Sequence, residues 1–233
     1  MKVIVPIPVF GRFPLLKLTI KRLYEKNKVH RVILIGHEPE AMKIANETGC
    51  DFINMPNNPL GAKWNAGFQA AQNYDHDAVL FAGSSDWISD DYLTLCEKHI
   101  DQHAMIGKFG CHFADIRNSK LRLVYWPGYT DAYRKNETIG IGRVLSKSLL
   151  RKINYKPFTD DKNNSMDYMM QQQVRLNYGK IKILHQNDGV LLSISTDLWV
   201  NKHDFEDHWT NRLPSEKMQP YPFLNQFPEI ANV

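Results

Sequence analysis

The sequence lacks the long apolar run that a membrane-spanning helix needs, since none of its apolar stretches reaches roughly 18 residues. The apolar opening MKVIVPIPVFGRF carries two prolines and Arg12 and has no small-residue cleavage site, so it does not resemble a signal peptide. The chain also lacks internal repeats and Gly/Ser-rich linkers. These absences predict a cytoplasmic protein with no membrane partner.

Cysteine is scarce. Cys50, Cys96 and Cys111 show no metal-type spacing and cannot all pair, which argues against a disulfide framework and fits a reducing compartment. We interpret the three thiols as small core residues.

The composition is that of a folded chain with a mild positive charge. Among its 233 residues 43% are hydrophobic and 23% charged, which excludes a disordered protein and allows a substantial core. A total of 29 Lys and Arg against 25 Asp and Glu gives a net charge of +4 and an isoelectric point near 8.8. This surplus is compatible with a nucleotide diphosphate or a nucleic acid as partner and requires neither.

The first hundred residues alternate between strand and helix patterns. We expect strands at 2–9, 32–35, 51–54 and 77–82, and helices at 15–23 after a turn at 11–14, at 39–48 and at 62–73. This order predicts an α/β fold with a mostly parallel central sheet flanked by helices. Crossovers should be right-handed.

The second half is less regular. We expect strands at 105–115, 120–126 and 180–184, helices at 145–153 and 167–178, and an irregular tail from Pro214. The simplest division is one domain, 1–233, with a nucleotide-binding half at 1–103, a mixed region at 104–200 that completes the site, and a tail at 201–233.

In open α/β sheets ligands bind beyond the carboxyl ends of the strands. This rule selects the loops at 8–12, 36–38, 57–65 and 83–86. In the last of them a buried strand runs into Gly83-Ser84-Ser85-Asp86, where the carboxylate offers a hard oxygen ligand for Mg²⁺ or Mn²⁺. The alternative role for Asp86 is an Asx turn or a helix cap.

Four segments in order resemble the family 2-like glycosyltransferases of the GT-A fold, which use nucleotide-activated sugars. The segments are VIVPIPVFGR, NNPLGAKWNAGFQAA, VLFAGSSDWISDDYL and NSMDYMMQQQVRLNYGKIKIL. They are similar, respectively, to the family's first strand with Pro-x-Tyr-Asn-Arg, its Arg-Asn helix, its acidic motif and its Glu-Asp helix. The likeness spans residues 3 to about 185 and implies a nucleotide-diphospho-sugar transferase fold. The resemblance extends to viral and phage-type members of the family.

The resemblance implies roles for particular residues. Asp86 would hold a divalent metal, Mn²⁺ or Mg²⁺, against the donor diphosphate, and Asp167 would be the general base of an inverting transfer. The donor would be bound by Pro8, Phe10, Arg12, Glu38, Lys63, Asn65, Ser84, Ser85 and Asp86. For Asp167 the alternative is a charge that stabilises a helix N-terminus, and for Lys63 it is an exposed helix lysine.

The sequence departs from the family pattern at the acidic motif. Gly83 and Ser85 stand where the family has acids, so Asp86 is the strong ligand that remains. His203, or with less support His185, could complete a metal site. After the second strand the family's base-reading Asp is absent, and Glu38 or His37 could contact a base edge or a ribose hydroxyl instead.

The stretch YWPGYTDAYRKNETIGIGRVLSKSLL lies in the region that forms the acceptor side in this family. Its candidate acceptor residues are Trp126, Tyr129, Arg134 and Arg143. Aromatic rings stack on sugars or bases and arginines bind phosphates, so this segment suits a glycan or a nucleic acid. The alternative is that Trp126 belongs to the core and that the Gly-Ile-Gly stretch is a tight connection.

The leading hypothesis is therefore an inverting hexosyl- or pentosyltransferase that uses a nucleotide sugar, expected to be a UDP-sugar. The acceptor would be a glycan, a small molecule or a hydroxymethylated base in DNA, and no protein partner is implied. The alternatives are a nucleotidyltransferase and a non-catalytic module that binds sugar nucleotides or glycans.

Overall fold

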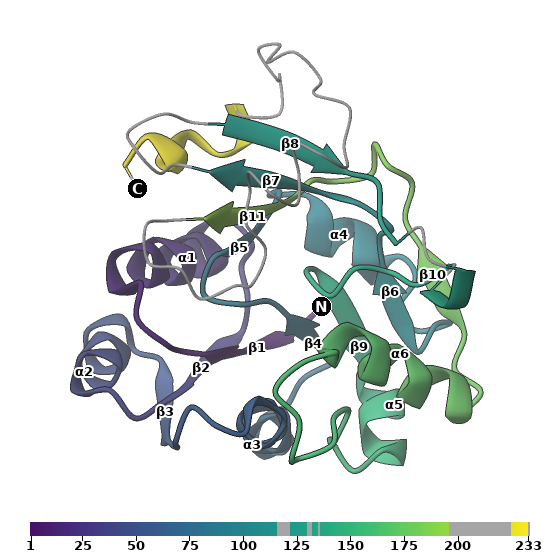
Figure 1. The fold of residues 1–233 in the computed structure, drawn as a ribbon, viewed down its shortest axis with the longest axis horizontal. Helices are drawn as coiled ribbons and strands as arrows, with labels where there is room; N and C mark the ends of the chain where they lie inside the picture. Colours follow the sequence, from purple (N-terminus) through teal and green to yellow (C-terminus); the bar gives the residue numbers. More distant parts are fainter. Residues whose placement is uncertain (116–121, 130–131, 135, 196–224, 233) are drawn as a thin grey trace.

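The chain folds around two β-sheets, one large and one small, in a computed structural model (Figure 1). The structure describes residues 1–115, 122–129, 132–134, 136–195 and 225–232. The large sheet has the strand order β10-β6-β9-β4-β1-β2-β3, and the small sheet has the order β5-β11-β7-β8. The expected α/β class is confirmed.

The large sheet is mostly parallel. Its strands are β1 (Val3–Pro8), β2 (Arg31–Gly36), β3 (Asp51–Asn54), β4 (Ala78–Phe81), β6 (Met105–Gly107), β9 (Arg143–Ser146) and β10 (Ile181–Ile183). Strand β9 runs antiparallel to both neighbours, β4 and β6, while the other adjacent pairs are parallel. The carboxyl ends of β1, β2 and β4 therefore meet at one edge, where loops can form a ligand site.

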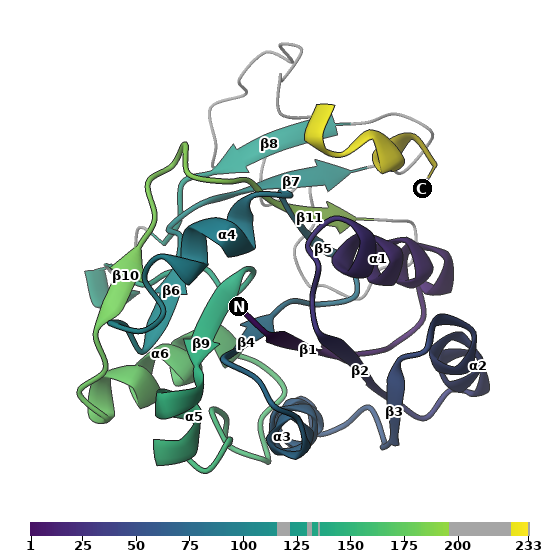
Figure 2. The ribbon, with the colours of Figure 1, turned by 180° about the vertical axis from the view of Figure 1, so that it is seen from behind.

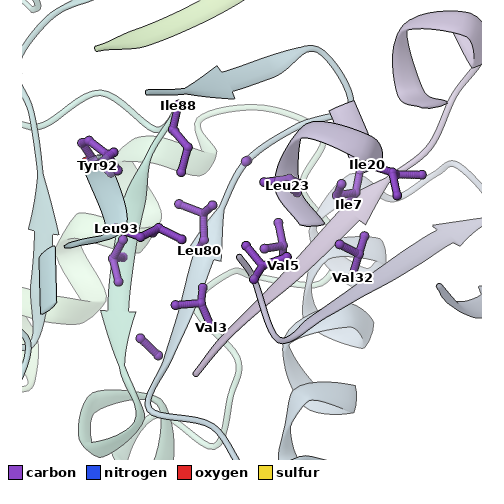
Figure 3. Close-up of a cluster of buried hydrophobic side chains, with 14 of the residues drawn as sticks. Val3, Val5, Ile7, Ile20, Leu23, Val32, Leu80, Ile88, Tyr92 and Leu93 are labelled. Atoms are coloured by element: carbon purple, nitrogen blue, oxygen red, sulfur yellow. The ribbon is translucent and has the colours of Figure 1, made fainter. Parts of the chain in front are cut away.

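Helices cover both faces of this sheet. One face packs against α1 (Phe13–Glu25), α2 (Pro39–Thr48) and α4 (Tyr92–Glu97), and the other against α3 (Leu60–Ala70), α5 (Lys147–Lys152) and α6 (Met166–Leu176). Successive side chains of a strand point to opposite faces, so Val3, Val5 and Ile7 of β1 join the first core and Ile4 joins the second. Figure 3 shows the first core, in which β1 lies beneath α1.

The small sheet lies on the far side of α1 and α4 from the large sheet (Figures 1 and 2). Its strands are β5 (Asp86–Ile88), β7 (Cys111–Asp115), β8 (Arg122–Trp126) and β11 (Leu191–Ser195). Its core contains Trp87 and receives Phe227, which precedes the short 3₁₀-helix Pro228–Asn232. Arg22 of α1 stacks over the Phe227 ring at 4.4 Å and bonds Glu229, so residues 227–229 are fixed to the domain.

Two expectations for the secondary structure were wrong, and two strands were not expected. The predicted strand 105–115 is two strands, β6 and β7, in different sheets, with a break at 108–110. The predicted helix 145–153 begins only at Lys147, because residues 143–146 form the buried strand β9. Strands β5 and β11 were not expected, and their antiparallel pairing carries Asp86 into the small sheet.

No helix within the described ranges is both long and apolar enough to cross a membrane.

Candidate active site

Arg12, in the loop after β1, contacts the loop after β4. Arg12 precedes α1 in a left-handed conformation, with φ of 51°, directly after Gly11 at φ of 61°. Its guanidinium donates hydrogen bonds to the Oγ atoms of Ser85, at 3.0 Å, and Ser84, at 3.3 Å. Burial lowers the pKa of Arg12, and the negative charge of Asp86 partly offsets this effect.

Asp86 is held at the junction of the two sheets. Its Oδ2 accepts a hydrogen bond from the Gly83 amide at 2.8 Å, and its Oδ1 accepts one from the Ser193 hydroxyl at 2.9 Å. Burial raises the pKa of Asp86, and the negative charge of Asp167 acts in the same direction; the two hydrogen bonds and Arg12 oppose the shift. The two carboxylates are therefore close enough to interact.

A second polar cluster lies beyond β2. Glu38 accepts a hydrogen bond from the Asn57 amide at 3.1 Å, and the Lys63 ammonium donates to Asn57 Oδ1 and to the Val9 carbonyl. Lys63 is 1% exposed, and burial lowers its pKa to about 8 against the attraction of Glu38. Lys63 is thus a buried cation, and its expected alternative as an exposed helix lysine was wrong.

The charge of Glu38 is favoured by its neighbours. Burial alone would raise the pKa of Glu38, but hydrogen bonds from Asn57 and the His37 amide, together with the charge of Lys63, leave it lowered. A carboxylate and an amide next to a buried ammonium offer both donors and acceptors to a ligand at this edge.

Asp167 lies in the first turn of α6. Its Oδ2 accepts hydrogen bonds from the Tyr129 hydroxyl at 2.5 Å and from the Gly140 amide at 2.8 Å. A Cβ at position 140 would lie 2.2 Å from Oδ1, so only glycine allows the backbone to approach this carboxylate so closely. Burial and the Asp167 charge raise the pKa of Tyr129, which keeps the phenol protonated and able to donate.

Arg143 is buried and bonds the backbone of Asp167. It is 0% exposed, and its guanidinium donates to Thr138 Oγ1 and the Ile139 carbonyl, both at 2.9 Å, and to the Asp167 carbonyl at 2.5 Å. The expected acceptor contact of Arg143 does not fit this position, because the side chain is wrapped by backbone carbonyls. We assign Arg143 to positioning the 138–140 turn and α6 relative to each other.

The other expected acceptor residues lie around Tyr129. The Arg134 guanidinium lies 3.2 Å from the centre of the Tyr129 ring and donates to Glu137 Oε2 at 2.9 Å. Burial would lower the pKa of Arg134, but the Glu137 carboxylate raises it above its ordinary value. The Trp126 ring meets the Tyr129 ring edge-on at 4.8 Å. Trp126, Tyr129 and Arg134 thus form one partly exposed group next to Asp167.

Three predicted donor residues have different surroundings. Pro8 is half-buried at the end of β1, and Phe10 is exposed in the loop that follows this strand. Asn65 is 1% exposed and bonds the backbone of Phe158 through both its amide nitrogen and its amide oxygen, and its nitrogen also donates to Asp160. Asn65 therefore holds a neighbouring loop, and its contact with a donor stays a prediction.

Of the predicted metal ligands, Asp86 and His185 lie within the described residues. His203 lies outside the described residues, and His185 is exposed in the connection between β10 and β11, where its amide bonds Asp188. His37 is exposed beside Glu38. Among the residues that the structure describes, no group of three His, Cys, Asp or Glu side chains could hold a metal ion.

Three contributors to the site were not named as candidates from the sequence. Asn57 links Glu38 to Lys63, Ser193 bonds Asp86, and Gly140 bonds Asp167. In each case the two bonded residues lie on different elements of the fold. Asn57 at least lay within a loop that the strand-end rule selected, whereas Ser193 belongs to a strand that was not expected.

The fold is shared with nucleotide-sugar enzymes. Residues 1–349 of TarS from S. aureus superpose with a TM-score of 0.58 at 14% identity, covering 83% of this chain and 60% of that one. The mannosyltransferase PcManGT from Pyrobaculum calidifontis, in complex with GDP-mannose and Mn²⁺, gives a TM-score of 0.54 at 11% identity over 83% and 56% of the two chains. The chain is thus an α/β protein with a GT-A-like glycosyltransferase fold.

Another similar structure belongs to a different reaction class. The inositol-1-phosphate CTP transferase of T. maritima superposes with a TM-score of 0.51 at 13% identity, covering 87% of this chain and 92% of that one. The chain spans about 60% of the TarS fragment's length and less of PcManGT. No protein-family model matches the sequence, and no curated protein is significantly similar to it. The comparisons therefore define a fold, and the activity is argued from the site.

Proposed function

We propose that this protein transfers a sugar from a nucleoside diphosphate sugar, with UDP as the expected nucleotide, to an acceptor hydroxyl. The observation that carries the proposal is the position of Asp167. This carboxylate comes from the second half of the chain, its charge raises the pKa of Asp86 in the loop after β4, and it is oriented through one of its two oxygens. Residues 1–103 would hold the donor and residues 104–200 the base and the acceptor.

Asp167 would act as the general base of an inverting displacement. Tyr129 and Gly140 both bond Oδ2, so Oδ1 is the oxygen that would take the proton of the acceptor hydroxyl. The acceptor oxygen would form its bond to the anomeric carbon while the bond from that carbon to the diphosphate oxygen breaks. The electron pair would leave with the nucleoside diphosphate, and attack from the opposite face would invert the anomeric configuration.

The cluster of Glu38, Asn57 and Lys63 would bind the nucleoside end of the donor. Its carboxylate, amide and ammonium lie beyond β2 and beside the loop of β1, where nucleotides bind in open α/β sheets. A similar structure, that of residues 1–349 of TarS, is in complex with UDP, and PcManGT holds GDP-mannose. These ligands support a nucleoside diphosphate in the donor.

The described residues do not fit the divalent metal expected from the sequence. Asp86 is the one acid in the loop 83–86, and both of its oxygens already accept hydrogen bonds from protein groups. The neighbouring hydroxyls of Ser84 and Ser85 face a guanidinium. A dication needs several oxygen ligands, and a fixed cation beside it would weaken its binding.

The acceptor would lie against Trp126, Tyr129 and Arg134. A ring platform beside an arginine suits a glycan, a small molecule or a hydroxymethylated DNA base. With a DNA acceptor, transfer should fall steeply as salt rises, because each phosphate contact releases counterions. A flat salt response would exclude DNA as the acceptor.

The proposal is tested by incubating wild type and Asp167→Asn with a panel of nucleotide sugars and measuring released nucleoside diphosphate. We expect wild type to turn over at least one donor, and Asp167→Asn to bind that donor with unchanged affinity but to lose roughly 100-fold or more of the rate. Glu40→Gln is a matched control, since Glu40 is on the outer surface of α2. Wild type that neither binds nor cleaves any donor would contradict the proposal.

The nucleotidyltransferase alternative has one observation in its favour, the superposition on a CTP transferase. Such an enzyme would cleave a nucleoside triphosphate and release pyrophosphate. Measuring pyrophosphate with CTP and UTP in the same panel separates the two reactions, because a glycosyltransferase releases nucleoside diphosphate and no pyrophosphate.

A further inference from the structure

The loop that follows β4 carries less negative charge than a metal-binding loop requires. In Gly83-Ser84-Ser85-Asp86 the carboxylate of Asp86 accepts hydrogen bonds from Gly83 and Ser193, so each of its oxygens already has a protein partner. Ser84 and Ser85 are 2% and 3% exposed, and their backbone carbonyls accept hydrogen bonds from Thr19 and Ile194. The loop is therefore held in one conformation without a metal ligand set.

The positive charge at this loop comes from Arg12. Its two terminal nitrogens bond the hydroxyls of Ser85 and Ser84, while its Nε is buried and has no hydrogen-bond partner among the described residues. A guanidinium has five N–H donors, so two hydrogen bonds leave most of its donor capacity unused within the described structure. Buried polar hydrogens without partners are costly, which points to an anionic ligand that completes this site.

We infer that the Arg12 guanidinium takes the role of a divalent metal, so that donor diphosphate binds to this site without a metal ion. This inference rests on the proposed function and specifies its diphosphate subsite. Ser84 and Ser85 hold the guanidinium plane, and the charge of Asp86 stabilises the cation across the loop. An arginine fork binds phosphate oxygens through paired N–H groups, as a metal ion would bind them through direct coordination.

The Arg12 guanidinium would also stabilise the diphosphate leaving group. When the bond between the anomeric carbon and the diphosphate oxygen breaks, the electron pair stays on that oxygen, and the negative charge of the diphosphate grows. A fixed guanidinium stabilises this charge through N–H···O contacts and gives up no proton, because arginine stays protonated in proteins. The balance of the transfer step needs no further reactant.

The test is the affinity for UDP and GDP, measured by isothermal titration calorimetry in EDTA and again with Mn²⁺. Wild type is expected to bind its nucleotide with the same affinity in both buffers, and Arg12→Met to bind it roughly tenfold or more weakly in both. Arg12→Lys keeps the charge but loses the fork, and is expected to fall between them. Arg31→Lys is the matched control, since Arg31 begins β2 at the opposite edge of the sheet.

Each outcome decides the inference. Wild-type binding that requires Mn²⁺ overturns the metal-free site and leaves the proposed function standing. No binding of UDP or GDP in either buffer overturns the inference, and the proposed function falls with it only if the whole panel of nucleotide sugars is also neither bound nor cleaved. If Arg12→Met fails to fold, judged by its circular dichroism, then Ser84→Ala/Ser85→Ala replaces it, because it releases the guanidinium while keeping its charge. Unchanged affinity in that double variant and in Arg12→Lys would overturn the inference.

Discussion

The Tyr129 hydroxyl and the Gly140 amide hold the same oxygen of Asp167, at 2.5 Å and 2.8 Å. One carboxylate oxygen is thereby fixed by donors from a loop and from a turn that precedes β9. The other oxygen, Oδ1, is bonded by neither of them. This asymmetry gives the carboxylate one orientation, which is what a general base aimed at a single hydroxyl requires.

Removing the Tyr129 hydroxyl should impair the base without affecting the donor. A hydrogen bond to a charged group contributes about 1.5–3 kcal/mol, so Tyr129→Phe is expected to lower kcat by roughly tenfold or more. The affinity for nucleoside diphosphate should stay that of wild type, because the Tyr129 hydroxyl bonds Asp167 and none of the residues proposed to bind the nucleotide. Steady-state kinetics with calorimetry separates the two effects. Tyr178→Phe, at a side chain that is 95% exposed, is the control.

A methyl group at position 140 should displace the catalytic carboxylate. In Gly140→Ala the new Cβ would meet Asp167 Oδ1 at 2.2 Å, well inside van der Waals contact, so the carboxylate has to move. Displacement of a reacting group by about 1 Å lowers a rate roughly 100-fold, and we expect a loss of that size in kcat. Nucleotide affinity serves as the internal control. A Gly140→Ala enzyme with wild-type kcat would contradict the assigned geometry.

The charge of Lys63 should make nucleotide binding depend on pH. Burial lowers the pKa of Lys63 to about 8, so its ammonium is lost as the pH rises through that value. Nucleotide affinity of wild type is therefore expected to fall between pH 7 and pH 9. Lys63→Met should bind more weakly at pH 7 and lack this step. A wild-type affinity that is constant over the same range would argue against a contact between Lys63 and the nucleotide.

Lys108 predicts a pH effect on stability that is independent of the donor. Its ammonium donates to the backbone carbonyls of Gln186, Asp188 and Gly189, which closes the connection between β10 and β11. Lys108→Met should destabilise the fold by about 1–3 kcal/mol, because these carbonyls lose their partner. Urea unfolding of wild type and variant measures the difference.

The sign of the pH effect follows from the lowered pKa. Burial lowers the pKa of Lys108 to about 8 from its ordinary 10.5. Between these values the unfolded chain binds more protons than the folded chain, so the stability of wild type relative to Lys108→Met should increase with pH there. Below pH 8 the difference should be constant. A difference that decreases across the window would contradict the buried position of the ammonium.

The regular part of the fold could be predicted from local sequence. The helix 39–48 begins with Pro39 and ends before Gly49 in a left-handed conformation, and both bounds were predicted as observed. Strand 51–54 was also predicted with its observed bounds. The errors concern strands that depend on distant partners. Strand β9 is four buried residues between β4 and β6, and this short mixture of apolar and polar residues carries no period of its own.

The candidate site could be predicted in part for the same reason. Asp86 was identified by its place after a buried strand, which is a local feature, and Asp167 by the resemblance of its helix to the family's Glu-Asp helix. Arg143 was assigned to the acceptor side because its stretch lies in the region that forms the acceptor side in the resembled family and because arginines bind phosphates, whereas here the carbonyls of Thr138, Ile139 and Asp167 surround it. Burial of a charge depends on partners that a single sequence does not reveal.

The most direct test of the central claim is the rate at which nucleoside diphosphate is released from a nucleotide sugar in the presence of an acceptor, for wild type and Asp167→Asn at equal donor saturation. The account predicts release by wild type, a loss of roughly 100-fold or more in the variant, and unchanged donor affinity. Equal rates for the two proteins would contradict it, because the reaction would then not use Asp167 as its base.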